Sequence, residues 1–320
     1  MTLADLTTVA IAGLGTMGRG IAHCLAAAGY AVRGYEPDEA ARRRVVPLLE
    51  SLQRTLIDAG LLDPEHAAPT LGRVRLFGDL EPCVKGAQLV VEAVPEVLEL
   101  KTELLAGLDE LCPPEVIFAS NTSGLSITKL AAATRRPDKV AGFHWWNPAH
   151  LMPLIEVTKG AETSDETADL LMALSRTLGK QPILVRRDVP GFVGNRLQFA
   201  VLREALHLVE EGIATPEDVD TAMKAGPGIR YAFLGPLETA DLGGLDVFAN
   251  ISSYLFAELA SNTKPPPALT ERVADGKLGV KAGAGFYPYT DRTLESILAK
   301  RDETLIKLAR ILGYAEDTEG

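Results

Sequence analysis

The chain lacks the features that mark secreted, membrane-spanning and metal-stapled proteins. Its 320 residues include only three cysteines, Cys24, Cys83 and Cys112, an odd number without the CxxC spacing of a zinc site. No apolar run approaches the eighteen or so residues that a membrane span needs, and the first residues carry neither the basic patch nor the long apolar run of a signal peptide. We therefore expect a cytoplasmic protein with buried free thiols, no metal and no membrane contact.

Basic residues are also scarce relative to acidic ones. The chain has 32 lysines and arginines against 43 aspartates and glutamates, which gives a formal net charge of −11. A nucleic-acid partner requires a basic surface that neutralises phosphates, and this composition argues against one. With 47% hydrophobic and 23% charged residues, the composition is that of a globular protein, and the length predicts two domains.

The hydrophobic patterns change character near residue 190. Before it, β-type runs alternate with helical ones, which is typical of a parallel sheet with crossover helices. After it, long helical patterns dominate. The sequence thus predicts a doubly wound, Rossmann-type α/β domain over residues 1–188 and an all-α domain over 189–320. The expected strands are 8–12, 31–35, 74–77, 89–94, 116–120, 140–144, 154–157 and 183–185, the expected helices include 39–60, 192–211, 216–225, 246–259 and 294–312, and 63–69 is expected to be rich in turns.

The first chemical signal is the turn Gly13-Leu14-Gly15-Thr16-Met17-Gly18, between a strand and an Ala-rich helix. Gly13 allows a tight turn, Gly15 lets the backbone approach a pyrophosphate, and Gly18 lets the helix pack on the sheet. Glu36 follows the next strand. A carboxylate at this position accepts a hydrogen bond from a ribose 2′-hydroxyl and repels a 2′-phosphate. The pattern predicts an NAD site that includes Gly13, Gly15, Thr16, Met17, Gly18 and Glu36.

Three consecutive arginines, Arg42 to Arg44, follow Glu36 on the next helix. One of them could reach back to the cofactor, which would weaken the preference for NAD over NADP. The alternatives are a solvated helix face or contacts with the phosphates of a substrate.

The second signal is a histidine at the end of a strand, His144, followed by Glu156 on the next one. The carboxyl ends of parallel strands line the crevice where cofactor and substrate meet. Oxidation of a secondary alcohol requires a base for the hydroxyl proton, and imidazole serves in both directions of the reaction. Glu156 is placed to orient the ring and to stabilise its charged form. His23, His66 and His207 are expected to be structural.

These residues and several further motifs resemble the 3-hydroxyacyl-CoA dehydrogenases over nearly the whole chain. The likeness includes the glycine turn, the segments Val91–Glu96 with Lys101, Ser120–Leu125 and His144–Pro148 with Glu156, and then Asp188–Arg196 and Lys277–Tyr287. The resemblance implies that His144 is the acid/base, that Glu156 is its partner, and that Ser123 and Asn195 contact the substrate oxygen. It implies that Glu92, Glu96, Lys101 and Asn121 line the nicotinamide side of the cofactor, and that the chain forms a homodimer through the helical domain. Ala93 and Val94 are also expected to bind the cofactor.

Two departures from the family pattern concern the substrate. Trp145 and Trp146 replace the Phe-Phe that follows the histidine in enzymes for short acyl-CoA, and each is either core or a wall that excludes water near the nicotinamide. The segment 226–239 is longer and is similar to that of gulonate dehydrogenase (λ-crystallin), carnitine dehydrogenase and the pyridine-carboxylate dehydrogenase of vitamin B6 breakdown. Arg230, expected in a loop over the active site, would bind a carboxylate bidentately, or else form a surface or interdomain salt bridge.

The sequence therefore predicts an NAD-dependent dehydrogenase of a 3-hydroxy group. Its substrate is either a 3-hydroxyacyl-CoA, such as 3-hydroxybutyryl-CoA, or a free hydroxy carboxylate held by Arg230. A non-catalytic, crystallin-like NAD-binding protein is a further alternative, and the complete set of His144, Glu156, Ser123 and Asn195 speaks against it.

Overall fold

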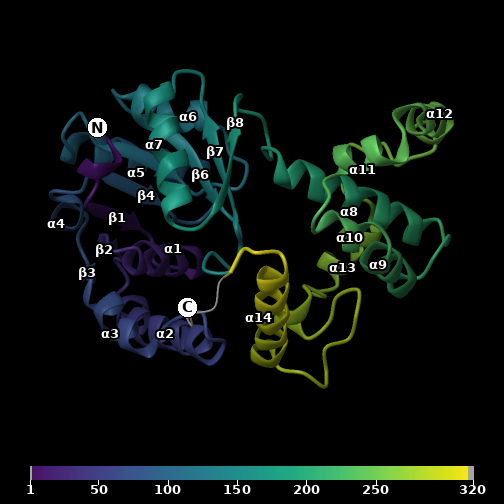
Figure 1. Ribbon diagram of the computed structural model, residues 1–320, viewed down its shortest axis with the longest axis horizontal. Helices are drawn as coiled ribbons and strands as arrows, with labels where there is room; N and C mark the ends of the chain where they lie inside the picture. The colour runs from purple at the N-terminus through teal and green to yellow at the C-terminus, as the bar shows by residue number, and fades with distance from the viewer. Residues whose placement is uncertain (1, 316–320) are drawn as a thin grey trace. The chain divides into compact units, whose positions relative to one another are not determined.

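The computed structural model describes residues 2–315 and divides into two compact units (Figure 1). The first unit comprises Met1–Arg196 together with Leu305–Gly320, and the second comprises Leu197–Thr304. The division follows the change from an α/β to an all-helical pattern, and it lies a few residues after the predicted boundary at 188.

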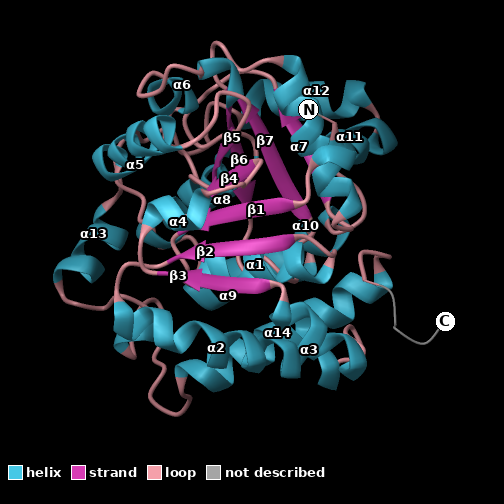
Figure 2. Ribbon diagram, turned by 90° about the vertical axis from the view of Figure 1, so that its left-hand side faces the viewer, coloured by secondary structure: helices cyan, strands magenta, loops and turns pink. Residues whose placement is uncertain are grey.

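The first unit is built on one eight-stranded sheet with the order β3-β2-β1-β4-β5-β6-β7-β8. Strands β3, β2 and β1 lie side by side in Figure 2. The order reverses between β1 and β4, the switch point at which doubly wound sheets bind ligands. The strands are β1 (Thr8–Ala12), β2 (Ala31–Tyr35), β3 (Val74–Phe77), β4 (Leu89–Glu92), β5 (Ile117–Ser120), β6 (Val140–Trp145), β7 (Leu154–Lys159) and β8 (Gln181–Val185).

Strand β7 runs antiparallel to β6 and parallel to β8, whereas all other neighbours in the sheet are parallel. The expectation of a parallel sheet is therefore incomplete at this edge. The reason is the short connection from Trp146 to Pro153, which contains no helix and cannot carry the chain back across the sheet. The antiparallel register places His144 directly opposite Glu156.

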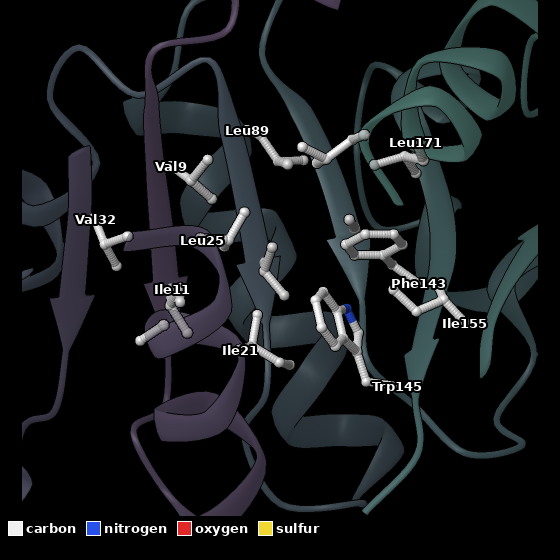
Figure 3. Close-up of a cluster of buried hydrophobic side chains, with 14 of the residues drawn as sticks. Val9, Ile11, Ile21, Leu25, Val32, Leu89, Phe143, Trp145, Ile155 and Leu171 are labelled. Atoms are coloured by element: carbon white, nitrogen blue, oxygen red, sulfur yellow. The ribbon is translucent and has the colours of Figure 1, made fainter. Parts of the chain in front are cut away.

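Alternate residues of the central strands face two separate cores. Val9 and Ile11 of β1 pack with α1 and α7, as Figure 3 shows for Ile21, Leu25 and Leu171. Ala10, between them, faces the opposite core under α5 and α6. This alternation follows from the pleat of a strand, and burial of both faces accounts for the continuous apolar runs in the sequence.

Seven helices flank the sheet, and one of them occupies a stretch expected to be turns. Pro64 occupies the first position of α3, where its missing N–H costs nothing. The carboxylate of Asp63 caps the helix by accepting from the N–H of Glu65 at 2.8 Å. The helices are α1 (Thr16–Ala27), α2 (Glu39–Asp58), α3 (Pro64–Gly72), α4 (Leu80–Val84), α5 (Leu98–Leu111), α6 (Ile127–Ala131) and α7 (Asp165–Thr177), with 3-10 turns η1 (Leu3–Asp5) and η2 (Pro137–Lys139).

The remaining chain is helical, as predicted. The segment expected as a loop around Arg230 is instead two helices, α10 and α11, each begun by a proline at its first position. The helices are α8 (Gly194–Glu210), α9 (Pro216–Ala225), α10 (Pro227–Tyr231), α11 (Pro236–Gly243), α12 (Leu245–Leu255), α13 (Pro267–Ala274) and α14 (Leu294–Ile311), with the 3-10 turn η3 (Val280–Ala282).

Within residues 2–315, no helix has the length and apolar character needed to cross a membrane. The cytoplasmic location stays a prediction. The three thiols are free; Cys83 and Cys112 are buried, whereas Cys24 is partly exposed.

Candidate active site

The glycine turn between β1 and α1 is shaped by backbone contacts that exclude side chains. Gly13 has a φ of +95°, and a Cβ there would lie 2.8 Å from the carbonyl oxygen of Ala93. A Cβ on Gly18 would lie 1.9 Å from the carbonyl oxygen of Gly13. Gly15 differs, because no protein atom lies within 4 Å of the position of its Cβ. The turn is thus packed against protein backbone at Gly13 and Gly18. At Gly15 it is open to a ligand that approaches the first amides of α1.

A cavity of about 760 Å³ opens beside this turn, entirely within the first unit. Glu36 borders it, and its carboxylate accepts bonds from the N–H groups of Leu14 and Asp38, each at 3.3 Å. That position suits a ribose hydroxyl. Ten of the residues predicted to bind the cofactor line the cavity, while Gly18 lies behind the turn: Gly13, Gly15, Thr16, Met17, Glu36, Ala93, Val94, Glu96, Lys101 and Asn121.

Two of the three arginines on α2 are engaged locally. Arg42 reaches back to the end of β2, where its Nη1 donates to the carbonyl oxygens of Glu36 at 2.6 Å and Pro37 at 3.3 Å. Arg43 forms an ion pair with Glu39 on the surface of the same helix. The local bonds of these two guanidinium groups leave less capacity for phosphates of a cofactor or substrate.

A buried ion pair lies at the floor of the cavity. Lys101 on α5 donates to Glu92 Oε1 at 2.6 Å and to the carbonyl oxygen of Val94 at 3.0 Å, and both charged side chains are at most 1% exposed. Lys101 Nζ also lies 3.3 Å from Glu96 Oε2. Since a buried charge is tolerated only when it is paired, this contact fixes the segment that follows β4.

Glu96 connects this ion pair to the loop that carries Ser123. Its Oε1 accepts from the hydroxyl of Thr122 at 2.6 Å and from the N–H of Ser123 at 2.8 Å. Asn121 is held in turn, because its Oδ1 accepts from the N–H of Trp145 at 2.9 Å. The Asn121 amide therefore points its remaining N–H donors away from this bond, and Asn121 and Ser123 both border the cavity.

The two predicted catalytic side chains are in direct contact. His144 Nδ1 lies 2.8 Å from Glu156 Oε2, and both residues are buried, with Glu156 fully inaccessible. Because the carboxylate can only accept, Nδ1 carries a proton and Nε2 keeps a lone pair. The ring nitrogen that faces away from Glu156 is therefore the one that can take a proton from a substrate.

Glu156 also organises the chain that leads into α8. Its Oε1 accepts from the N–H groups of Val193 at 3.0 Å and Gly194 at 2.9 Å. Burial alone would raise the pKa of the Glu156 carboxyl, but the hydrogen bonds from His144, Gly194 and Val193 outweigh it and hold that pKa below its usual range. The group is thus an ionised carboxylate that can stabilise a positively charged imidazole.

Aromatic rings flank His144 on two sides. Trp146 lies at a centroid distance of 5.5 Å and Phe192 at 5.9 Å. Phe192 is held at φ +50°, in the left-handed region that side chains other than glycine rarely adopt, and such strain is typical of functional sites. Trp145 points to the other face of the sheet and is core, packed with Phe143 and Ile155 (Figure 3).

Asn195 joins the two halves of the site. It follows the amides that bind Glu156, and its Nδ2 donates to the carbonyl oxygen of Ser123 at 2.8 Å. The structure thus brings together His144, Glu156, Ser123 and Asn195 within one unit. Arg230 belongs to the second unit, where it is exposed on α10, and within residues 2–315 no carboxylate lies within ion-pair distance of it. The choice between a carboxylate ligand and a surface or interdomain salt bridge for Arg230 stays a prediction.

Sequence reasoning did not find several groups that support these residues. The amides of Val193 and Gly194 and the N–H of Trp145 are backbone groups, which leave no trace in residue identity. Gly191, with φ +77°, does leave one. A glycine of this kind just before a helix indicates a sharp turn of backbone toward another group.

Comparisons with known proteins agree with this geometry. Residues 8–189 match the NAD-binding domain of 3-hydroxyacyl-CoA dehydrogenase, and residues 191–289 match the C-terminal domain of the same family. The 5-formyl-3-hydroxy-2-methylpyridine 4-carboxylate 5-dehydrogenase of Mesorhizobium japonicum is 40% identical over 96% of this chain and 98% of its own length.

Two solved structures cover the fold to different extents. A 5-formyl-3-hydroxy-2-methylpyridine 4-carboxylic acid 5-dehydrogenase, described as an NAD⁺-dependent dismutase, superposes with a TM-score of 0.90 at 38% identity, over 97% of this chain and 100% of its own. The (S)-3-hydroxybutyryl-CoA dehydrogenase of Ralstonia eutropha gives a TM-score of 0.76 at 39% identity, over 89% of this chain and 100% of its own. With its NAD-binding turn and two matched domains, the chain belongs to the 3-hydroxyacyl-CoA dehydrogenase family of NAD-dependent enzymes that act on CH–OH groups.

Proposed function

We propose that this chain transfers hydride from an alcohol carbon of its substrate to NAD while His144 Nε2 accepts the hydroxyl proton. The contact of His144 with Glu156 at 2.8 Å carries this assignment, because it fixes the ring and leaves Nε2 as the base. As the C–H bond breaks with its electron pair and the O–H bond loses its proton, the alcohol becomes a carbonyl. The charged imidazole that results is stabilised by the Glu156 carboxylate.

Ser123 and Asn195 are proposed to bind the reacting oxygen. Ser123 is exposed beside the cofactor cavity, and the amide of Asn195 has a second N–H after it donates to the carbonyl oxygen of Ser123. Hydrogen bonds to the oxygen from these two groups would hold the alcohol in line with the cofactor and polarise the carbonyl in the reverse reaction.

For the substrate, we propose a free carboxylate in preference to a coenzyme A thioester. The match with the pyridine-carboxylate enzyme extends over 97% of this chain, and the match with the hydroxybutyryl-CoA enzyme over 89%. Arg230 supplies an exposed guanidinium without a carboxylate partner in residues 2–315, and a guanidinium binds a carboxylate by two parallel hydrogen bonds.

The thioester alternative needs cations for the phosphates of coenzyme A. Of the arginines that could provide them, Arg42 binds backbone carbonyls and Arg43 binds Glu39. Arg44 is exposed on the same helix. With two of these three arginines bonded locally, a chain with a net charge of −11 gives little attraction for a polyphosphate.

The catalytic assignment is tested with His144→Gln. Glutamine keeps the size of the side chain and loses the base, so we expect kcat to fall by about two to four orders of magnitude while the Kd for NADH stays within about threefold. Fluorescence titration with NADH measures the binding step separately. Full activity in this variant would contradict the mechanism, and loss of NADH binding would mean that the substitution damaged the cofactor site.

The substrate class is tested by NADH formation with 3-hydroxybutyryl-CoA, 3-hydroxybutyrate, gulonate, carnitine and a pyridine carboxylate that bears an alcohol or aldehyde. For the best free acid we expect Arg230→Ala to lower kcat/KM by about 10- to 100-fold, equivalent to the loss of a charge-assisted contact. Arg230→Lys keeps the positive charge but not the planar guanidinium, so we expect it to retain part of the kcat/KM that Arg230→Ala loses. Activity on the thioester alone, unchanged in Arg230→Ala, would refute the carboxylate proposal.

We also propose a homodimer formed through the helical part of the chain, residues 189–320 in the predicted domain division. In the second unit, residues 197–304, all of which the structure describes, the buried apolar side chains are Leu206, Ala260 and Pro266. Its exposed side chains include many large apolar ones, among them Leu237, Leu242, Leu245 and Phe256. Such a surface supports a second copy of the chain as its partner.

A further inference from the structure

The two adjacent tryptophans differ in what their indole N–H groups contact. Trp146 Nε1 donates to Glu156 Oε2 at 3.3 Å. That oxygen is the one that accepts from His144 Nδ1 at 2.8 Å. Since the ring of Trp146 also lies beside that of His144, at 5.5 Å and tilted by 48°, the indole touches both members of the proposed catalytic pair.

The indole is held in this position by the start of α8. A Cβ on Gly194 would lie 2.4 Å from Trp146 Cζ2, so the six-membered ring occupies the space that a side chain at position 194 would need. Gly194 also donates its N–H to Glu156 Oε1 at 2.9 Å. The glycine therefore serves two contacts at once, and Trp146 cannot turn toward α8.

Glu156 receives four donors in total. Val193 and Gly194 bind Oε1, while His144 and Trp146 share Oε2. A carboxylate offers about four lone-pair directions, so this one is saturated. Each donor draws negative charge away from the oxygen it binds, and the two donors on Oε2 compete for the same charge.

We propose that Trp146 is a positioning residue that sets the basicity of His144 through Glu156. Its N–H reduces the charge that Oε2 presents to the imidazole, so the protonated ring is stabilised less than it would be by a carboxylate free of this bond. The inference rests on the roles proposed above for His144 and Glu156.

In residues 2–315, the charged side chains other than His144 do not account for the electrostatics of Glu156. Of the charged side chains, His144 is the one with a coulombic effect on the Glu156 carboxyl. The rings packed on His144 are those of Trp146, which follows β6, and Phe192, which precedes α8, and neither carries a charge. Lys101 and Glu92, on α5 and β4, are paired with each other.

Trp145 provides a matched control. It precedes Trp146 in the chain and points to the opposite face of the sheet, where it is 1% exposed, and its Nε1 is buried without a hydrogen-bond partner in residues 2–315. A change of Trp145 to phenylalanine alters the same kind of ring and removes an N–H that contacts no carboxylate.

The test is the pH dependence of kcat/KM for alcohol oxidation in Trp146→Phe, Trp145→Phe and wild type. We expect the acid limb of the profile to move to higher pH in Trp146→Phe, by about 0.3 to 1 unit, because the loss of one hydrogen bond to a charged group shifts a protonation equilibrium by that order. The readout is the position of the acid limb, which does not depend on the height of the alkaline plateau. In Trp145→Phe the acid limb should stay in place, even if thermal stability falls.

A second variant removes the N–H without a change of shape. Incorporation of 3-benzothienylalanine at position 146 keeps the bicyclic ring against Gly194, and it should produce the same shift as Trp146→Phe. An acid limb that stays in place in both variants, or one that moves equally in Trp145→Phe, would overturn the proposal. Activity retained in His144→Gln would refute the proposed mechanism instead, so the two failures are distinguishable.

Discussion

His23 lies on α1 with 4% of its surface exposed and with no hydrogen-bond partner for Nε2 in the described residues. Burial lowers the pKa of this imidazole to about 4, and the nearby ammonium of Lys180 contributes in the same direction. Lys180 is itself buried, where its Nζ donates to the carbonyl oxygens of Ala149 at 2.7 Å and Met152 at 2.9 Å. A neutral His23 is thus required beside a buried cation.

This histidine predicts a loss of stability in mild acid. Its pKa of about 4 in the folded chain lies below the ordinary value of 6.5, so the unfolded chain binds more protons between these two pH values. Stability is therefore complete above pH 6.5 and falls as the pH falls toward 4, by about 3 kcal/mol in total. Between pH 7 and pH 4.5 this loss amounts to about 2.4 kcal/mol. We expect His23→Gln, which does not titrate, to lose that much less stability than wild type when urea unfolding is measured at these two pH values.

The control for this experiment is His66→Gln, because His66 is exposed on α3. The pH dependence of unfolding in this variant should parallel wild type. Parallel curves for wild type and His23→Gln would mean that His23 is protonated in the folded chain at no cost.

Single residues were predictable where their chemistry is specific to a site. His144 and Glu156 could be paired because an acid/base needs a partner on the adjacent strand, and the register confirms that they lie opposite each other. The different fates of Trp145 and Trp146 were not predictable, because both fit a core equally well. Which of them faces Glu156 depends on where β6 ends, and strand ends are poorly marked in sequence.

At the level of elements, the turn that begins α1 separates two functions of glycine. Gly18 supports the fold, since a Cβ there would collide with the backbone of Gly13, whereas Gly15 has open space around its Cβ position and a φ of −62° that any residue adopts. Only a ligand that approaches the first amides of α1 would meet a side chain at position 15.

We expect Gly15→Ala to weaken NADH binding by at least tenfold while the thermal midpoint stays within about 2 °C of wild type. Gly18→Ala should lower both the affinity for NADH and the thermal midpoint, because α1 must move to relieve the collision of the new Cβ with the backbone of Gly13. Titration with NADH and thermal unfolding without cofactor separate the two effects. Normal NADH affinity in Gly15→Ala would mean that the cofactor does not approach the turn at this residue.

Most elements were predictable from periodicity, and the exceptions have identifiable causes. The strands of the central sheet are continuous apolar runs and were found. The direction of β7 was not, since a residue pattern carries no information on direction. Helix α3 was hidden by Pro64 and Pro69, and α10 by the Gly226-Pro227-Gly228 sequence, although a proline at the first position of a helix is favourable.

At the level of the whole molecule, the two units differ in how they bury apolar surface. The first unit has two cores on either side of its sheet. The second unit, residues 197–304, all described, has few buried apolar residues. On α11 and α12 its leucine side chains are largely exposed, with exposed fractions of 81% for Leu237, 74% for Leu242 and 62% for Leu245. An exposed apolar surface of this kind supports the dimer proposed above.

The dimer proposed above makes stability depend on protein concentration. We expect light scattering after size exclusion to give twice the chain mass of 34.2 kDa, and we expect the thermal midpoint to rise as protein concentration is raised, because association stabilises the folded chain by mass action. Leu242→Asp with Leu245→Asp places charges on this surface and should shift the protein toward monomer. Leu111→Asp, a change at a similarly apolar exposed position (41%) in the first unit, is the control and should remain dimeric. A wild-type chain that is monomeric at micromolar concentration, with a concentration-independent midpoint, would show that these helices need no second copy to stay folded.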